Sequence, residues 1–233
     1  MFGSARAMSP EDLAEEIKKA WASLESASDA EAAAIRQKVT ICEQMSRYYA
    51  DATRLSYLLT KHFQGIPDAR NLYVVCSGGG PGIMEAANRG AHEAGGKTVG
   101  FGISLPFEQG INRFIDRDLA FEFHYFFMRK YWFMYMAKAL VVFPGGYGTM
   151  DEFFEVLTLV QTRKVTKKLP IILYGSSYWE DIIRLDNMVK WGVISPEDVD
   201  LFKICDTPEV AFEYLRREIN HNDPSEPEPP VAE

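Results

Sequence analysis

A glycine-rich turn followed by acidic residues is the pattern in this sequence with the clearest chemistry. Residues 144–152 read Pro-Gly-Gly-Tyr-Gly-Thr-Met-Asp-Glu, between the apolar run 139–143 and the helical pattern 153–157. Glycines allow backbone N–H groups to approach a ligand closely, and the start of a helix favours a phosphate group. The turn therefore predicts a phosphate site with the carboxylate of Glu152 beside it.

The pair Thr149 and Glu152 also has a purely structural interpretation. A threonine followed three residues later by a glutamate is the capping box, in which Thr149 precedes the helix and Glu152 reaches back to it. A cap needs no glycine, whereas a phosphate cradle needs several. Gly145, Gly146 and Gly148 therefore favour phosphate binding, and capping stays open as a second role of the pair.

A second glycine loop, Ser-Gly-Gly-Gly-Pro-Gly at 77–82, also joins an apolar run to a helical pattern. Neither loop continues into the Gly-Lys-Ser/Thr of a P-loop, and neither completes the GxGxxG dinucleotide pattern. Triphosphate hydrolysis and nicotinamide-dependent chemistry therefore lack support. The two loops suit a nucleoside monophosphate or a sugar phosphate, and the alternative for residues 77–82 is a tight strand-to-helix turn.

Short apolar runs rich in β-forming residues alternate with helical patterns along the chain. This alternation predicts an α/β fold of the Rossmann-like type, a doubly wound parallel sheet with helices on both faces. Ligands of such sheets lie outside the carboxyl ends of the strands, so both glycine loops are expected to face one crevice. The predicted strands are residues 72–76, 98–103, 119–123, 140–143, 170–174 and 201–205.

We expect a single domain over residues 1–219. Within it, residues 10–63 read as helical throughout, with a break near 26–29, and predict an insertion of two or three helices. Residues 220–233 contain almost nothing apolar to bury and predict a disordered tail.

Composition narrows the possible partners and the compartment. The net charge of −8 argues against a nucleic-acid surface, and no apolar run is long enough to span a membrane. Cys42, Cys76 and Cys205 show neither a disulfide framework nor metal-ligand spacing, and the histidines show no metal motif. We therefore expect a cytoplasmic protein that binds a small nucleotide and needs no metal.

The segment 124–136 is the most aromatic part of the chain. Aromatic and Met enrichment of this kind favours packing in a core or at a subunit interface over stacking on a base. It predicts a homodimer or a larger homo-oligomer. Arg129 and Lys130 lie within the segment and need an anionic partner, which could be Glu152 or a ligand phosphate.

Three motifs in order, Gly-Gly-Gly-Pro-Gly-Ile-Met-Glu at 78–85, Met-Arg-Lys at 128–130 and Pro-Gly-Gly-x-Gly-Thr-x-x-Glu at 144–152, make the chain resemble the Lonely Guy (LOG) family. The resemblance covers roughly residues 72–215. It implies a nucleoside 5'-monophosphate phosphoribohydrolase that releases a free base from AMP or a cytokinin riboside monophosphate, without a cofactor. Older labels call such sequences lysine decarboxylases, but no residue pattern here indicates a pyridoxal site.

The resemblance also implies roles for individual residues. Glu152 and Arg129 match the catalytic pair of the family, and the position of Glu152 near a helix start favours its charged form. Glu108 and Asn112 match a segment that helps to close the nucleotide pocket. The implied substrate-binding residues are Gly79, Gly80, Glu85, Glu108, Met128, Lys130, Gly145, Gly146, Gly148 and Thr149.

Two points stay open at this level. Residues 2–6 match the loop that ends the first strand of the family, most of which has no counterpart here, so the roles of Ser4 and Arg6 are undecided. The alternative function is a non-catalytic nucleotide or molybdenum-cofactor carrier of related fold, which would need the glycines but not the pair of Arg129 and Glu152.

Overall fold

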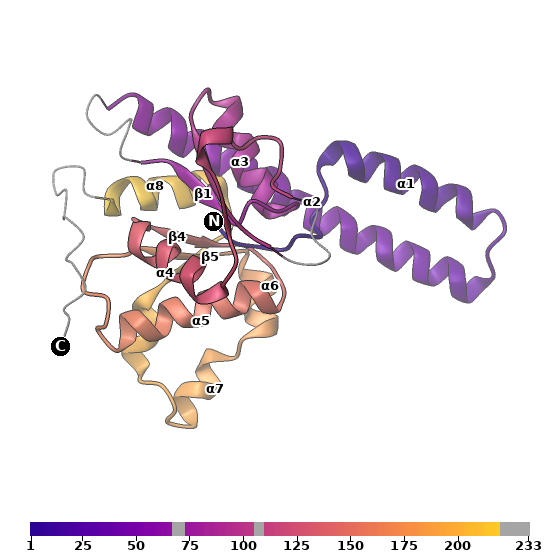
Figure 1. Ribbon diagram of the computed structural model, residues 1–233. Coiled ribbons are helices and arrows are strands. Elements are labelled where there is room, and N and C mark those ends of the chain that lie inside the picture. Colours follow the sequence, from indigo (N-terminus) through magenta and orange to yellow (C-terminus); the bar gives the residue numbers. More distant parts are fainter. Residues whose placement is uncertain (67–72, 105–109, 220–233) are drawn as a thin grey trace.

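The computed structural model describes residues 1–66, 73–104 and 110–219 (Figure 1). Its strands are parallel and alternate with helices, which confirms the predicted α/β class. Each strand overlaps a predicted run, most clearly where the strand is buried along its whole length and reads as a continuous apolar stretch. The strands are β1 (Val75–Ser77), β2 (Thr98–Ile103), β3 (Ala120–Phe123), β4 (Leu140–Val142), β5 (Ile171–Tyr174) and β6 (Lys203–Cys205).

The strands form two parallel sheets of three, in the orders β1-β2-β3 and β4-β5-β6. In the first sheet Val75 pairs with Thr98, and in the second Leu140 pairs with Ile171. The edges β1 and β4 are flanked by the amino terminus of the chain, where Phe2 forms a parallel bridge with Val142. The two glycine loops, residues 77–82 and 144–148, follow the carboxyl ends of β1 and β4.

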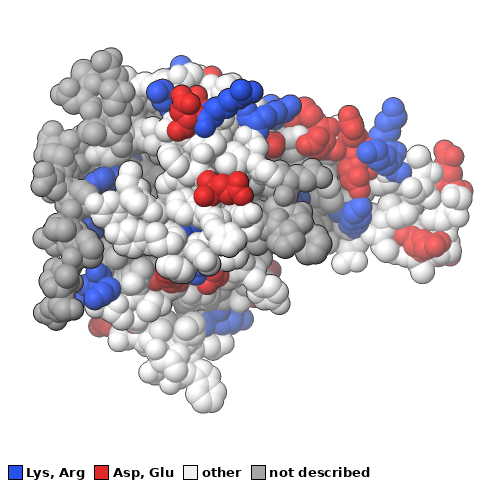
Figure 2. Space-filling model, in the orientation of Figure 1, with Lys and Arg blue, Asp and Glu red and all other residues white. Residues whose placement is uncertain are grey.

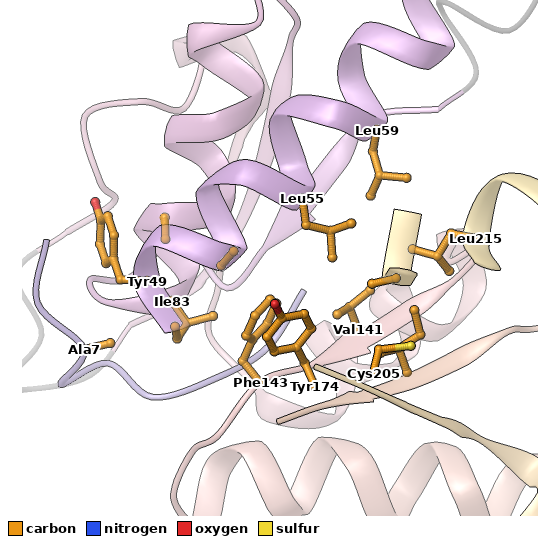
Figure 3. Close-up of a cluster of buried hydrophobic side chains, with 14 of the residues drawn as sticks. Ala7, Tyr49, Leu55, Leu59, Ile83, Val141, Phe143, Tyr174, Cys205 and Leu215 are labelled. Carbon is orange, nitrogen blue, oxygen red and sulfur yellow. The ribbon is translucent and has the colours of Figure 1, made fainter. Parts of the chain in front are cut away.

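Helices cover both faces of the strands (Figure 1). On one face a buried cluster joins α2 and α8 to alternate residues of β4 and β5, including Val141 and Tyr174 (Figure 3). On the other face Leu140, Val142 and Phe153 belong to a cluster that includes α5 and α6. The covering helices are α2 (Asp29–Gln64), α3 (Ile83–Glu93), α4 (Phe126–Met136), α5 (Tyr147–Gln161), α6 (Ser176–Ile182) and α8 (Pro208–Glu218).

The residues predicted to be helical before the first strand form a hairpin of α1 (Pro10–Leu24) and the long helix α2. Ser9 caps α1 by accepting a hydrogen bond from the backbone N–H of Asp12, and Ser28 forms a capping box with Glu31 at the start of α2. The predicted break thus falls between the helices. The hairpin extends away from the body, whereas the second half of α2 is packed in the core (Figure 1).

The remaining described elements are α7 (Leu185–Lys190) and the short 3-10 helices η1 (Arg117–Leu119) and η2 (Pro196–Leu201). The tail predicted for residues 220–233 lies outside the described residues. Of the helices that the structure describes, none combines the length and apolar character needed to cross a membrane.

Candidate active site

Helix α5 begins earlier than the capping-box pattern predicts. Gly146 is the N-cap, Tyr147 is the first helical residue, and no side chain caps this end of the helix. Thr149 and Glu152 therefore both lie inside the helix, and the predicted capping box is wrong. The glycine turn enters the helix directly, which frees the Glu152 carboxylate from a capping role.

The three glycines of this turn have different surroundings. A side chain at Gly145 would overlap the hydroxyl of Thr149, so packing alone explains that glycine. At Gly146 and Gly148 nothing lies within 4 Å of the position a Cβ atom would take. Because packing requires neither, the open backbone at the start of a 15-residue helix fits the predicted anion site.

Glu152 is buried on the same face of α5 as Thr149, and it faces helix α4. The Nη2 atom of Arg129 lies 3.6 Å from Oε1 of Glu152. The guanidinium also lies 5.2 Å and 5.7 Å from the ring centroids of Phe126 and Phe133. Glu152, one of the two anionic partners predicted for Arg129, is thus its observed partner. The two aromatic rings limit the movement of the guanidinium next to this carboxylate.

The Glu152 carboxyl has an unusual pKa. Burial raises the pKa to about 7, and the positive charges of Arg129 and Lys130 only partly offset this effect. The sequence-based expectation that the charged form is favoured is therefore wrong in direction. Desolvation outweighs the helix dipole because the residue is in the second turn of α5, beyond the turn where the dipole acts most strongly.

Lys130 joins α4 to α5 next to this carboxyl. Its Nζ atom lies 2.7 Å from Oδ2 of Asp151 and 2.8 Å from Oε2 of Glu155, two residues that flank Glu152 along the helix. Sequence reasoning placed Lys130 among the substrate-binding residues. Its observed contacts are within the protein, where it fixes the spacing between Arg129 and Glu152.

Two glycines of the loop at 77–82 have structural reasons of their own. Gly79 and Gly82 have positive φ angles of 78° and 70°, which favour glycine, and a side chain at Gly82 would overlap the carbonyl of Ser4. A side chain at Gly80 would meet only the flexible end of the Met84 side chain, so packing does not require glycine there. The tight-turn interpretation therefore accounts for Gly79 and Gly82, whereas packing requires glycine neither at Gly80 nor at Gly146 and Gly148 before α5.

A network of buried polar side chains makes hydrogen bonds to the backbone of the loop at 77–82. The Nδ2 atom of Asn112 donates hydrogen bonds to the carbonyls of Gly79 and Gly80, at 3.0 and 3.1 Å, and to Oδ1 of Asn88 at 2.9 Å. Asn88 is fully buried and donates to the hydroxyl of Thr98. Sequence reasoning missed Asn88, and its only signal is a polar residue on an otherwise apolar helix face.

Ser4 connects the two glycine loops. Its backbone N–H donates to the carbonyl of Pro144 at 2.9 Å, and its carbonyl accepts from the N–H of Ile83 at 3.0 Å. The loop after β1 and the loop after β4 are therefore neighbours. This agrees with the expectation that both loops face one crevice. Arg6 is exposed, and its backbone N–H donates to the Ser4 hydroxyl.

Three other residues were predicted to bind the substrate, and the structure places them differently. The Glu85 carboxylate accepts a hydrogen bond of 2.9 Å from the hydroxyl of Tyr49, so its described contact is with α2. Met128 is exposed at the start of α4. Glu108 lies outside the described residues.

Parallel strands, helices on both faces and an open glycine turn at a helix start define a Rossmann-like α/β protein. The chain belongs to the LOG family. The family model, described as "Possible lysine decarboxylase", matches residues 84–215.

Curated relatives carry a more specific name. "Probable cytokinin riboside 5'-monophosphate phosphoribohydrolase LOGL2" from Oryza sativa subsp. japonica is 26% identical over 149 residues, 63% of this chain and 60% of the relative. "Cytokinin riboside 5'-monophosphate phosphoribohydrolase LOG3" from Arabidopsis thaliana is 27% identical over 130 residues, 55% of this chain and 59% of that protein. The chain thus spans about three-fifths of the length of these two relatives.

Among solved structures, that of TM1055, a structural genomics target, aligns with a TM-score of 0.50 and 23% identity. The alignment covers 74% of this chain and 89% of the other. This similarity supports the fold alone.

Proposed function

We propose that the protein hydrolyses the N-glycosidic bond of a nucleoside 5'-monophosphate, with AMP or a cytokinin riboside monophosphate as substrate. The observation that carries the proposal is the buried pair of Arg129 and Glu152 on a helix whose glycine entry is open to a ligand. The names of the curated relatives support the same reaction.

The position of Glu152 along α5 matches the distance between the 5'-phosphate of a nucleotide and the bond that is broken. Glu152 is five residues after Tyr147, which corresponds to about 7.5 Å along the helix axis. In a nucleotide, the 5'-phosphate and the C1' atom lie on opposite sides of the ribose. A phosphate held at Gly146 and Gly148 therefore leaves C1' within reach of the Glu152 face of the helix.

The reaction needs a carboxylate at that position. The bond from C1' to the base nitrogen breaks with its electron pair on the base, and positive charge develops on the sugar. An ionised Glu152 stabilises this charge and accepts a proton as water adds to C1', while the departing base takes up a proton. The products are the free base and ribose 5-phosphate, and the phosphate supplies binding energy without reacting.

The protonation of Glu152 sets when this chemistry can occur. With a pKa of about 7, the carboxyl is half ionised near neutral pH. A general base works best when its pKa lies near the working pH. Arg129 acts on this carboxyl by favouring its charged form and fixing its orientation.

Two lysines that contact α4 or α5 have partners within the protein, which favours hydrolysis over chemistry on a lysine Schiff base. Lys130 is paired with two carboxylates of α5. The Nζ atom of Lys167 donates to three carbonyls at the end of α4, those of Met134, Tyr135 and Ala137. Both lysines thus have structural partners, so the description of the family as possible lysine decarboxylases gains no support from them.

Incubation of the protein with AMP tests the proposal. We expect adenine and ribose 5-phosphate in equal amounts, and much slower release of adenine from adenosine, which lacks the phosphate anchor. Equal turnover of AMP and adenosine would contradict the phosphate site. Tight AMP binding without release of adenine would instead support the carrier function.

We also propose that a second copy of the chain packs against α4. Tyr125, Phe126, Phe127 and Tyr131 are each between 46% and 66% exposed, an unusual aromatic surface for a monomer. Figure 2 shows a broad face of the body with few charged side chains. Sedimentation equilibrium should give a dimer or larger oligomer, and Phe127→Glu should shift it toward the monomer.

We further propose that the protein is cytoplasmic. Cys42, Cys76 and Cys205 are all unpaired, and Cys205 is buried, which suits a reducing compartment. Fractionation of cells that express a tagged full-length protein checks this placement.

A further inference from the structure

The peptide that joins Gly145 to Gly146 has no side chain on either side of it. Glycine lacks the Cβ atom that limits φ and ψ in other residues, so steric contacts restrain the orientation of this peptide only weakly. In a trans peptide the C=O group and the N–H group point in opposite directions. Rotation of the peptide would therefore turn the N–H of Gly146 away from a phosphate at the turn.

The hydroxyl of Tyr178 holds this peptide in one orientation. It donates a hydrogen bond of 2.5 Å to the carbonyl of Gly145, which is buried and needs a partner. Because the carbonyl points toward Tyr178, the N–H of Gly146 points away from α6. Gly146 is exposed, so an anion can reach this N–H.

The pairing of β4 with β5 brings Tyr178 to the turn. The two strands are parallel and Val142 pairs with Leu173, so the segments that follow them lie side by side. Gly175 makes the bend between β5 and α6, with a positive φ of 93° that favours glycine. Tyr178 therefore lies in the first turn of α6, next to the glycine turn after β4.

Trp179 fixes α6 in this place. Its Nε1 atom donates to the carbonyl of Tyr174 at 3.0 Å, and its ring centroid lies 5.5 Å from that of Phe153 in α5. The neighbouring Tyr178 hydroxyl is thus presented to the turn by a helix that is anchored to both β5 and α5. Burial raises the pKa of Tyr178, so the hydroxyl stays protonated and able to donate at neutral pH.

We propose that Tyr178 is a positioning residue for the phosphate site. By holding the carbonyl of Gly145, it keeps the N–H of Gly146 directed at the 5'-phosphate of the substrate. The inference rests on the function proposed above, because that phosphate belongs to its substrate. Tyr178 acts through the backbone of the turn, so its hydroxyl contributes to binding of the phosphate and not to the step at C1'.

Replacement of Tyr178 by phenylalanine tests the role, because it removes the hydroxyl and keeps the ring. In Tyr178→Phe the KM for AMP should rise about fivefold or more, while kcat changes by less than about twofold. The KM for adenosine, which has no phosphate, should not change. Ser177→Ala is the matched control, since it removes an exposed hydroxyl from the same helix, and both KM values should equal those of the unaltered protein.

Binding of ribose 5-phosphate checks the same role without catalysis. Calorimetric titration should give an affinity about fivefold weaker in Tyr178→Phe than in the unaltered protein. The amide resonance of Gly146 should shift when ribose 5-phosphate is added to the unaltered protein, and it should shift less in the variant at equal saturation.

The outcomes separate this inference from the proposed reaction. Equal affinities of Tyr178→Phe and the unaltered protein for ribose 5-phosphate would overturn the role of Tyr178, even if AMP is hydrolysed. Equal increases in KM for AMP and adenosine would also overturn it, because they would indicate a general change of structure. Weaker binding in the variant, with no adenine released by either protein, would support Tyr178 and contradict the hydrolase. Failure of the unaltered protein to bind ribose 5-phosphate would overturn both.

Discussion

The guanidinium of Arg129 in α4 lies 3.6 Å from the carboxylate of Glu152 in α5, and both side chains are largely withdrawn from solvent. Burial opposes charge on Glu152, whereas Arg129 favours it. The carboxyl therefore changes protonation near neutral pH. The proposed phosphate site lies at the glycine turn that begins the same helix. Helix α5 thus carries both a titratable carboxyl, Glu152, and the glycine turn proposed to bind the substrate phosphate.

The folded protein should lose stability as the pH rises from about 4.5 to 7. The pKa of Glu152 is about 7 in the folded protein against an ordinary value of 4.5, so the unfolded chain ionises first over this range. Below 4.5 the carboxyl is protonated in both states, and above 7 the loss is complete, at about 3 kcal/mol. Denaturant unfolding at several pH values measures this slope. Glu152→Gln should lack it, and an unchanged slope would contradict the raised pKa.

The rate of base release should rise with pH. If ionised Glu152 is the reacting form, kcat/KM for AMP increases through a midpoint near pH 7. A stopped assay with buffers of constant ionic strength measures the profile. A rate that falls across the same range would assign Glu152 to proton donation instead.

Lys130→Met should move that profile to higher pH. Lys130 lowers the pKa of Glu152, whereas the carboxylates of Asp151 and Glu155 raise it, so loss of the lysine shifts the midpoint upward by up to about one unit. Lys164→Met is the matched control, since Lys164 is exposed. Identical midpoints in both variants would show that Lys130 does not set the charge of Glu152.

Gly148→Ala should separate stability from ligand binding. Nothing lies within 4 Å of the added methyl group, and alanine is favoured over glycine inside a helix by up to about 1 kcal/mol. The variant should be at least as stable as the parent, yet its KM for AMP should rise about tenfold, because the methyl group occupies the phosphate site. Gly145→Ala should instead destabilise, through its overlap with Thr149. An unchanged KM in Gly148→Ala would move the phosphate elsewhere.

The strands and the pairing of Arg129 with Glu152 were predictable from the sequence. Buried parallel strands are continuous apolar runs, and residues 98–103 coincide with β2. An arginine among aromatic residues requires an anion, and Glu152 was one of the two partners expected. Local patterns were sufficient in these cases.

The start of α5 and the pKa of Glu152 were not predictable. The Thr-x-x-Glu pattern is the same whether the helix begins at Met150 or at Tyr147, and glycine can itself be the N-cap. The pKa depends on burial against α4, which is distant along the chain. Asn88 supports the loop at 77–82 through hydrogen bonds with Thr98 and Asn112, residues that are distant from it along the chain.

The most direct test of the proposed hydrolase compares AMP turnover by the unaltered protein and by Glu152→Gln. We predict stoichiometric adenine and ribose 5-phosphate from the unaltered protein, and a decrease in kcat of at least about 100-fold in the variant. Inhibition by ribose 5-phosphate, or its direct binding, should persist in the variant because the glycine turn is intact. Equal rates of adenine release by the two proteins, or no release by either, would contradict the account.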